Sequence, residues 1–167
     1  MNDVGYMKRE LRRYENRLTV IGTGIMALDI WSLIKEVMTV INDKNYFHAL
    51  IDDPDMSPLL YDIIVFLLIV FFALFLLLHL YIGLAARSEG FGKQKGWFYL
   101  ILTVGFMLLY IDNIFICIYD FENYFSSGSD GVISLLIDIT TVVTMAEVLY
   151  ASVRVKTLRQ KLSKEAV

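Results

Sequence analysis

Cysteine, proline and glycine are all scarce in this chain of 167 residues, which contains one, two and ten of them respectively. The single cysteine, Cys117, excludes an internal disulfide framework and any metal site built from several cysteines. So few prolines and glycines exclude a collagen-like chain and Pro-rich disorder. Charged residues are also few, at 20% of the chain, whereas hydrophobic residues make up 57%, above the roughly 45–50% of average soluble domains. This composition argues against a soluble protein.

Sequence signatures of several enzyme classes are missing as well. A zinc protease needs His-Glu-x-x-His, but the two histidines, His48 and His79, lie far apart in the chain. The nucleophile elbow Gly-x-Ser-x-Gly is absent. Residues 87–96 are glycine-rich, yet Lys93 precedes Gln94 rather than Ser or Thr, so this connection is no phosphate-binding loop. We therefore expect no cofactor and favour a non-enzymatic role, while acid–base chemistry by buried carboxylates stays open.

The dominant feature of the sequence is a set of four long apolar segments. They span about residues 18–41, 60–86, 97–119 and 131–153. Each has roughly the 20 residues that a helix needs to cross a bilayer core. The second segment contains an unbroken apolar run, residues 63–78, which leaves no polar face for a soluble bundle. The pattern predicts an all-α integral membrane protein, a four-transmembrane-helix bundle that forms one membrane domain.

Basic residues are sorted by position, and this predicts the orientation. Thirteen of the fifteen Lys and Arg residues lie in segments 1–17, 87–96 and 154–167. The positive-inside rule then places both termini in the cytoplasm, and we expect the plasma membrane as the location. Apolar residues recur at helical spacing within both basic termini, so we expect these termini to lie on anionic lipid head groups. A net charge of −3 gives no reason to expect a nucleic-acid partner.

The two outer connections, about residues 42–59 and 120–130, are acidic. Acidic loops are ordinarily just solvated, although rings of acids also concentrate cations at a pore mouth. Pro54 and Pro58 are expected to lie in the first outer loop and to separate it from the second helix. Asn-Tyr-Phe occurs in both loops, at 45–47 and 123–125, so the bundle could consist of two helical hairpins related by duplication.

Ionisable and amide residues inside the apolar segments are the most informative feature. A charged residue at the bilayer centre costs at least about 2.5–3.5 kcal/mol on insertion scales. Several such residues must therefore face one another, face water, be protonated or meet cations. The candidates for an ion site or polar relay are Asp29, Lys35, Glu36, His79, Asp112, Asn113, Asp138 and Glu147.

Depths estimated at 1.5 Å per residue sort these candidates into two layers. The outer layer is expected to contain Lys35, Glu36, Asp112, Asn113 and Asp138. The inner layer is expected to pair His79 with Glu147, and Asp29 lies between the layers. Helical spacing also predicts an inward-facing polar seam on the fourth helix, made of Ser134, Asp138, Thr141, Thr144 and Glu147.

The leading functional expectation is a proton- or cation-linked channel or transport subunit that uses these buried acids. It could require a homo-oligomer, because four helices enclose little room for a pore. The alternative is a non-catalytic subunit that assembles with a larger membrane protein through its intramembrane carboxylates. A third interpretation is purely structural, in which the polar residues form only interhelical bonds.

Overall fold

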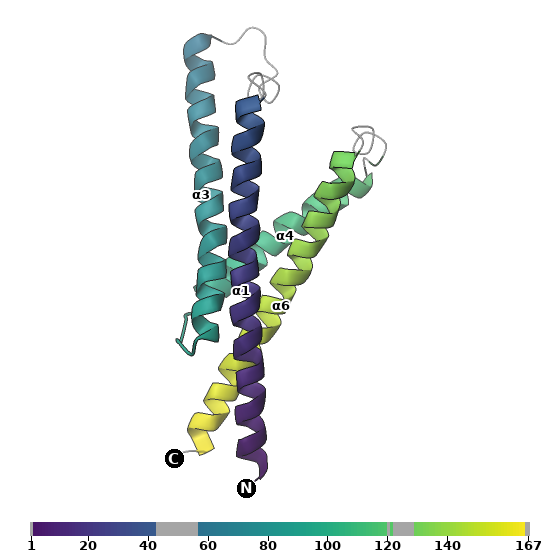
Figure 1. Ribbon diagram of the computed structural model, residues 1–167. Helices are drawn as coiled ribbons and strands as arrows, with labels where there is room; N and C mark the ends of the chain where they lie inside the picture. Colours follow the sequence, from purple (N-terminus) through teal and green to yellow (C-terminus); the bar gives the residue numbers. More distant parts are fainter. Residues whose placement is uncertain (1, 43–56, 120, 122–128, 166–167) are drawn as a thin grey trace.

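A computed structural model describes residues 2–42, 57–119, 121 and 129–165 of the chain. Its elements are α1 (Asn2–Asn42), α3 (Pro58–Gly90), α4 (Phe98–Tyr119) and α6 (Ser129–Glu165). The all-α prediction is confirmed for this described part (Figure 1). Within it, three helices are long and apolar enough to cross a membrane: α3, α4 and the part of α6 at Leu135–Glu165. The first helix, α1, is not among them and contains Asp29, Lys35 and Glu36.

The boundaries of α3 follow from local sequence. Ser57 is the N-cap, and its side chain accepts a hydrogen bond from the backbone N–H of Leu60 at 3.4 Å. Pro58 occupies the first helical turn, where a missing N–H and a fixed φ are favourable. The expectation that Pro58 lies in the outer loop is therefore wrong. At the other end Gly92 adopts a φ of 87°, which a glycine reaches without strain, and the chain turns toward α4.

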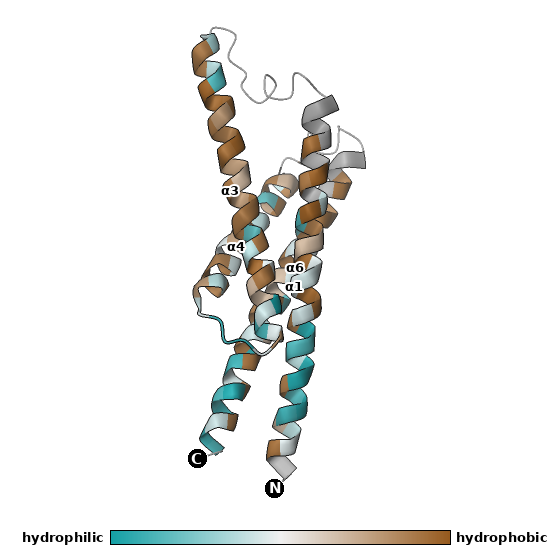
Figure 2. Cartoon of the chain, turned by 60° about the vertical axis from the view of Figure 1, so that its left-hand side comes forward, coloured by the Kyte–Doolittle hydropathy of each residue, from teal (hydrophilic) through white to brown (hydrophobic). Residues whose placement is uncertain are grey.

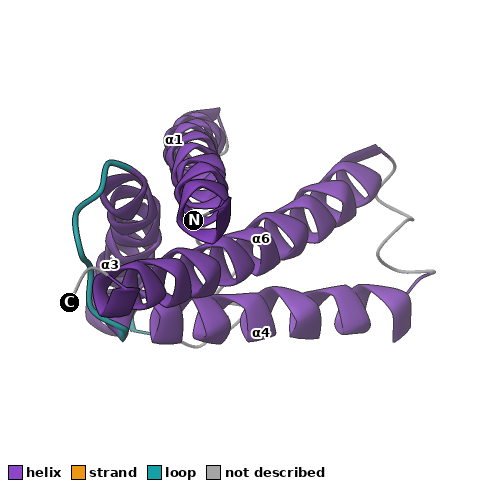
Figure 3. Ribbon diagram, turned by 90° about the horizontal axis from the view of Figure 1, so that it is seen from below, coloured by secondary structure: helices purple, strands orange, loops and turns teal. Residues whose placement is uncertain are grey.

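The helices form two antiparallel pairs that diverge at one end. Figure 1 shows α1 and α3 side by side, whereas α4 and α6 lean away from them toward the end opposite the termini. Figure 3 gives the same arrangement from below, with α4 beside α6. Both chain termini lie at the other end, where α1 and α6 extend beyond the apolar part and become hydrophilic (Figure 2). The molecule is thus tightly joined at the end that carries the termini and open at the other.

The buried core sits where the four helices cross and near the termini. Its members, from all four helices, are Leu18, Ile25, Ile82, Ala85, Ala86, Tyr99, Leu100, Phe106, Met145, Val148, Ala151 and Val155. The outer half of α3 instead exposes most of its large apolar side chains. Lipid tails are as apolar as these side chains, so such a surface is stable in a bilayer.

Glycines allow the backbones of α1 and α3 to approach closely. A Cβ added to Gly22 would lie 2.6 Å from both the backbone nitrogen of Arg87 and the carbonyl oxygen of Gly83. Such a distance is too short for any real Cβ contact, so only glycine fits here. Nothing lies within 4 Å of a Cβ on Gly24, two residues further along α1. The contact therefore depends on one face of α1 only.

The predicted extensions at the two termini pack against each other. Leu11 and Tyr14 of α1 contact the core that contains Val155 of α6, and Val155 is fully buried. Their apolar faces are therefore covered by protein rather than available to lipid. Contact of these termini with anionic lipid stays a prediction, and it would depend on the exposed basic side chains Lys8, Arg9, Arg12, Arg13, Lys161 and Lys164.

Several expectations lie outside the described residues. They include Pro54, most of the acidic outer loops and both Asn-Tyr-Phe segments, so the proposed duplication stays a prediction. The backbone of α1 includes Lys35 and Glu36, but their side chains are not described.

Candidate functional site

Asp29 and His79 form a buried pair between α1 and α3. His79 Nδ1 and Asp29 Oδ1 are in hydrogen-bond contact. Asp29 is 4% exposed and His79 is 8% exposed. Helical spacing explains why Asp29 faces α3. It lies on one buried face of α1 together with Leu18, Gly22 and Ile25. On α3 the same spacing places His79 with Ile82, Gly83 and Ala86 on its buried face.

Two aromatic rings of α4 flank the histidine. The ring centroid of Phe106 lies 5.2 Å from that of His79, and the centroid of Tyr110 lies 6.1 Å from it. The other polar atoms of the pair, Asp29 Oδ2 and His79 Nε2, are buried and have no hydrogen-bond partner among the described residues. An unpartnered buried polar atom is costly, and such an atom commonly marks a functional position.

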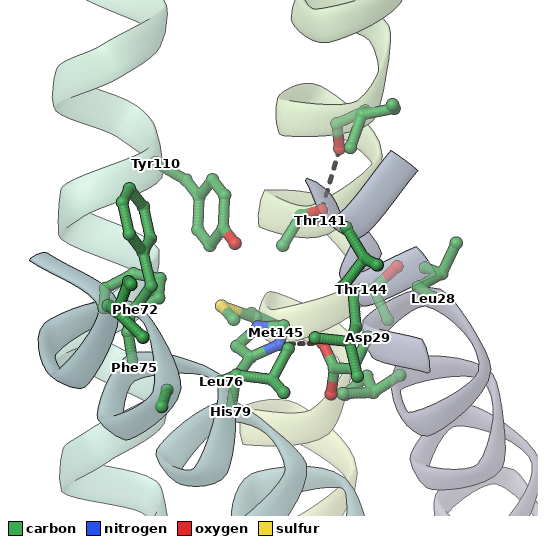
Figure 4. Close-up of a pocket in the computed structure, with 16 residues that line it drawn as sticks. Leu28, Asp29, Phe72, Phe75, Leu76, His79, Tyr110, Thr141, Thr144 and Met145 are labelled. Atoms are coloured by element: carbon green, nitrogen blue, oxygen red, sulfur yellow. Dashed lines mark hydrogen bonds and ion pairs between the residues drawn. The ribbon is translucent and has the colours of Figure 1, made fainter. Parts of the chain in front are cut away.

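A cavity of about 560 Å³ lies next to this pair, in the space between the two diverging helix pairs (Figure 4). This volume falls within the roughly 300–1,000 Å³ of small-molecule sites. All four helices contribute to the walls, which are mostly aliphatic and aromatic. The polar exceptions are Asp29, His79, Tyr110, Thr141 and Thr144. The cavity is therefore an apolar chamber with polar groups gathered on part of its wall.

The hydroxyl groups of the two threonines in the cavity wall already donate hydrogen bonds to the backbone. Thr141 donates to the carbonyl oxygen of Ile137 at 2.8 Å, and Thr144 donates to that of Thr140 at 2.7 Å. Each hydroxyl oxygen can still accept a hydrogen bond. Tyr110 differs, because its hydroxyl makes no hydrogen bond to any described residue and points toward the cavity in Figure 4. It can both donate and accept.

A second polar contact joins α4 to α6. Asn113 Nδ2 donates to Asp138 Oδ2 at 2.7 Å, and Asp138 is 8% exposed. The sequence predicted both residues in one outer layer, and the structure brings them together. Asp112, expected in the same layer, is exposed and has no hydrogen bond or ion pair within the described part of the chain.

The predicted pairing of His79 with Glu147 is wrong. Glu147 forms an ion pair with Arg17 of α1 at 3.1 Å, and both side chains are nearly half exposed. The error lies in the predicted seam on α6. Nine residues at about 100° each turn a helix by about 900°, so Glu147 lies on the side opposite Asp138. The buried stripe of α6 instead continues from Asp138 and Thr141 through Met145, Val148, Ser152 and Val155.

Sequence reasoning missed a fully buried carboxylate, Glu89. Tyr99 donates a hydrogen bond to Glu89 Oε2, and Lys156 Nζ lies 2.8 Å from Glu89 Oε1. Arg159 donates to the backbone oxygen of Glu89 at 2.8 Å and to Glu15 Oε1 at 2.7 Å. We name these five side chains the basal cluster, and they join all four helices. Residues 87–96 were expected to be a glycine-rich connection between helices, but α3 continues to Gly90 and includes Glu89.

Further contacts strengthen the same end of the molecule. Arg154 donates to Glu10 Oε1 at 2.9 Å, and the hydroxyls of Tyr14 and Tyr150 lie 3.3 Å apart. The hydrogen bond with Tyr150 and the nearby Arg154 guanidinium lower the pKa of Tyr14 from its usual value, against the effect of burial. These contacts join α1 to α6 near the termini. Among the described residues, no comparable polar contact joins the two helix pairs at the end where they diverge.

Among the described residues, no three His, Cys, Asp or Glu side chains lie close enough together to hold a metal ion. Comparison with protein-family models, with curated proteins and with solved structures finds no match to this chain. Function is therefore inferred from the chemistry of the site itself.

Proposed function

We propose that this chain is a four-helix protein of the plasma membrane, one membrane domain in which α1 is the fourth spanning helix and both termini are cytoplasmic. Support comes from the contacts of the basal cluster, because they gather three basic segments at one end of the molecule. That distribution matches the positive-inside rule for an even number of spans. The charge of Asp29 does not oppose the proposal, since Asp29 is buried against His79 rather than exposed to lipid.

Within this protein, the Asp29–His79 pair is the proton site of a proton-linked transport subunit. The observation that carries the proposal is the burial of this pair beside a cavity shared by both helix pairs. Histidine is the side chain whose charge ordinarily changes between about pH 5 and 8. Asp29 lies about 16 Å from the cytoplasmic boundary of its segment, at 1.5 Å per residue, which is near the middle of a bilayer core.

Loss of the proton changes the charge balance of this site. With His79 protonated, the pair is a neutral ion pair in a low-dielectric environment. With His79 neutral, the charge of Asp29 is no longer balanced, which is costly in the membrane interior. The two protonation states therefore favour different arrangements of α1 and α3 around the cavity. Asp138 offers a second proton acceptor on the path, since it shares a face of α6 with Thr141 of the cavity wall.

Proton flux in proteoliposomes tests this proposal. The purified chain is reconstituted with a pH-sensitive dye inside the vesicles, and a proton gradient is imposed in the presence of a counter-ion. We expect flux with the native chain and its loss with Asp29→Asn, which removes the charge but preserves shape. Asp62→Asn is the matched control, because Asp62 is an exposed aspartate of α3 outside the cavity. Equal flux with Asp29→Asn and the native chain would overturn the proton role of the pair.

Assembly with a larger membrane protein is a second candidate function, and Asp112 favours it. This carboxylate is exposed on the membrane segment α4 and has no partner within the described residues. A basic residue of another membrane protein would neutralise it. Cross-linking in native membranes would then yield a larger complex that Asp112→Asn weakens. A complex formed only by copies of this chain would support a homo-oligomeric transporter instead.

A further inference from the structure

We propose that the exposed basic face of the N-terminal extension of α1 binds an acidic helix of a cytosolic protein. We name this face the basic stripe, and it consists of Lys8, Arg9, Arg12 and Arg13. The inference rests on the proposed function in one respect, because the direction of the stripe is argued from a spanning α1 with a cytoplasmic N-terminus. Proton transport plays no part in it.

The acids of the extension pair with α6, and this leaves its outer face with bases alone. Glu10 accepts a hydrogen bond from Arg154 at 2.9 Å, and Glu15 accepts one from Arg159 at 2.7 Å. The exposed residues between positions 4 and 17 are Gly5, Tyr6, Lys8, Arg9, Arg12, Arg13, Asn16 and Arg17. None is acidic, and among the described residues only Arg17 of this set has an ion pair. The four bases of the stripe are therefore uncompensated within the described chain.

The arrangement of these bases opposes the stability of the helix. Lys8 and Arg12 are four residues apart, as are Arg9 and Arg13, so like charges lie one turn apart on the same face. Such pairs destabilise a helix by about as much as opposite charges stabilise it. Membrane orientation requires bases on the cytoplasmic side, but it does not require them on one helix face. A bound polyanion would remove the repulsion.

The direction of the stripe argues against a lipid surface as its occupant. A single helix runs from Asn2 to Asn42, so the extension points away from the bilayer along the axis of the spanning part (Figures 1 and 2). At 1.5 Å per residue, Arg13 lies about 8 Å and Lys8 about 15 Å beyond Leu18. Head groups occupy only about 5–8 Å on each side of the apolar core. The lipid contact that the sequence predicts for this terminus thus involves only the lower end of the stripe.

The composition of the face fits a protein partner. Arginine and tyrosine are enriched at protein interfaces, whereas lysine is depleted there. Three of the four bases of the stripe are arginines, and Tyr6, which is 58% exposed, lies one turn from Arg9. Arginine binds a carboxylate through two parallel hydrogen bonds. Carboxylates spaced four residues apart on a partner helix repeat the spacing of the stripe, so the partner is a helix with Glu or Asp along one face.

Binding of a designed acidic helix tests the inference. The full-length protein is placed in nanodiscs of neutral lipid, which leave both of its ends accessible. Fluorescence anisotropy compares two peptides of identical composition: one has its glutamates along one face, and the other has them distributed around the helix. We expect the one-faced peptide to bind about tenfold more tightly, because only it can pair with all four bases at once. Its binding should weaken as the salt concentration rises.

Two charge-matched double variants locate the binding site. Arg9→Gln combined with Arg13→Gln should weaken binding of the one-faced peptide about tenfold, as the loss of two surface ion pairs predicts. Lys161→Gln combined with Lys164→Gln removes the same charge from exposed positions of α6 and should leave the affinity unchanged. The stripe variant should unfold at the same temperature as the native chain or a higher one, since it loses like-charge repulsion. A purely structural role would lower that temperature.

Quenching by lipid distinguishes the two occupants. A dye attached at Arg9→Cys is compared with one at Gln94→Cys, in nanodiscs that contain anionic lipid with spin-labelled head groups; native Cys117 is buried. We expect stronger quenching at position 94, in the connection between α3 and α4. Stronger quenching at position 9, equal affinity for the two peptides, or equal losses in the two double variants would overturn the inference. Peptide binding without proton flux would defeat only the transport proposal, and flux without preference for the one-faced peptide would defeat only this inference.

Discussion

At the residue scale, buried carboxylates occur at three places among the described residues: Glu89 in the basal cluster, Asp29 beside His79, and Asp138 beside Asn113. The basal cluster pairs Glu89 with Lys156, and Tyr99 donates to the same carboxylate. In the Asp29–His79 pair, the buried atoms Asp29 Oδ2 and His79 Nε2 have no hydrogen-bond partner among the described residues, and both residues line the cavity. We interpret the first as a structural anchor and the second as the functional position.

The anchor role of Glu89 predicts a large loss of stability on its neutralisation. Glu89→Gln removes a charge from a fully buried site and leaves Lys156 without its counter-ion. We expect a decrease of about 1.5–3 kcal/mol in the free energy of unfolding, the range for hydrogen bonds to charged groups. Thermal unfolding in detergent, followed by circular dichroism, measures this loss.

Glu165→Gln provides the control for that measurement, because Glu165 is exposed at the end of α6. Its unfolding temperature should equal that of the native chain. A Glu89→Gln protein as stable as the control would show that the basal cluster is not the anchor.

At the element scale, the sequence predicted the helices but not which faces meet. Four helical segments follow from apolar runs alone, and the described chain contains four helices. Which helix packs against the buried face of α3 depends on close backbone contacts. His79 lies on the same face of α3 as Gly83, and Gly83 packs against Gly22 of α1. Depth along a helix could be estimated from residue number, but the direction around the axis depends on these close contacts. That is why His79 was assigned to Glu147 instead of Asp29.

The α1–α3 contact predicts opposite effects for two neighbouring glycines. Gly22→Ala forces the helices apart, since its Cβ would overlap backbone atoms of Arg87 and Gly83. We expect a destabilisation of about 1–3 kcal/mol, the usual cost of overpacking. Gly24→Ala meets nothing within 4 Å and should be neutral or stabilising by up to about 1 kcal/mol, because alanine favours a helix. Chemical denaturation of the two variants side by side gives the comparison, and equal stability would refute this packing.

At the scale of the whole molecule, the membrane character was predictable and the cavity was not. Apolar length and the sorting of basic residues depend on local sequence, which can be counted. The cavity exists because α4 and α6 diverge from α1 and α3, and no single segment encodes that divergence. The mutual packing of the two long terminal extensions also required the structure, since either extension alone has the pattern of a lipid-facing helix.

The proposed threading makes a prediction about which positions are reachable from outside the cell. Single cysteines are introduced at four exposed positions, which lie near each terminus, at the start of α3 and in the α3–α4 connection: Lys8→Cys, Lys161→Cys, Leu59→Cys and Gln94→Cys. Native Cys117 is buried and gives little background. A membrane-impermeant maleimide applied to intact cells should label only the Leu59→Cys protein. The other three should react only after permeabilisation. The Lys8→Cys protein tests whether α1 crosses the bilayer. Only a spanning α1 places the N-terminus and the start of α3 on opposite sides. If α1 does not span, the maleimide must label the Lys8→Cys protein on intact cells as it labels the Leu59→Cys protein.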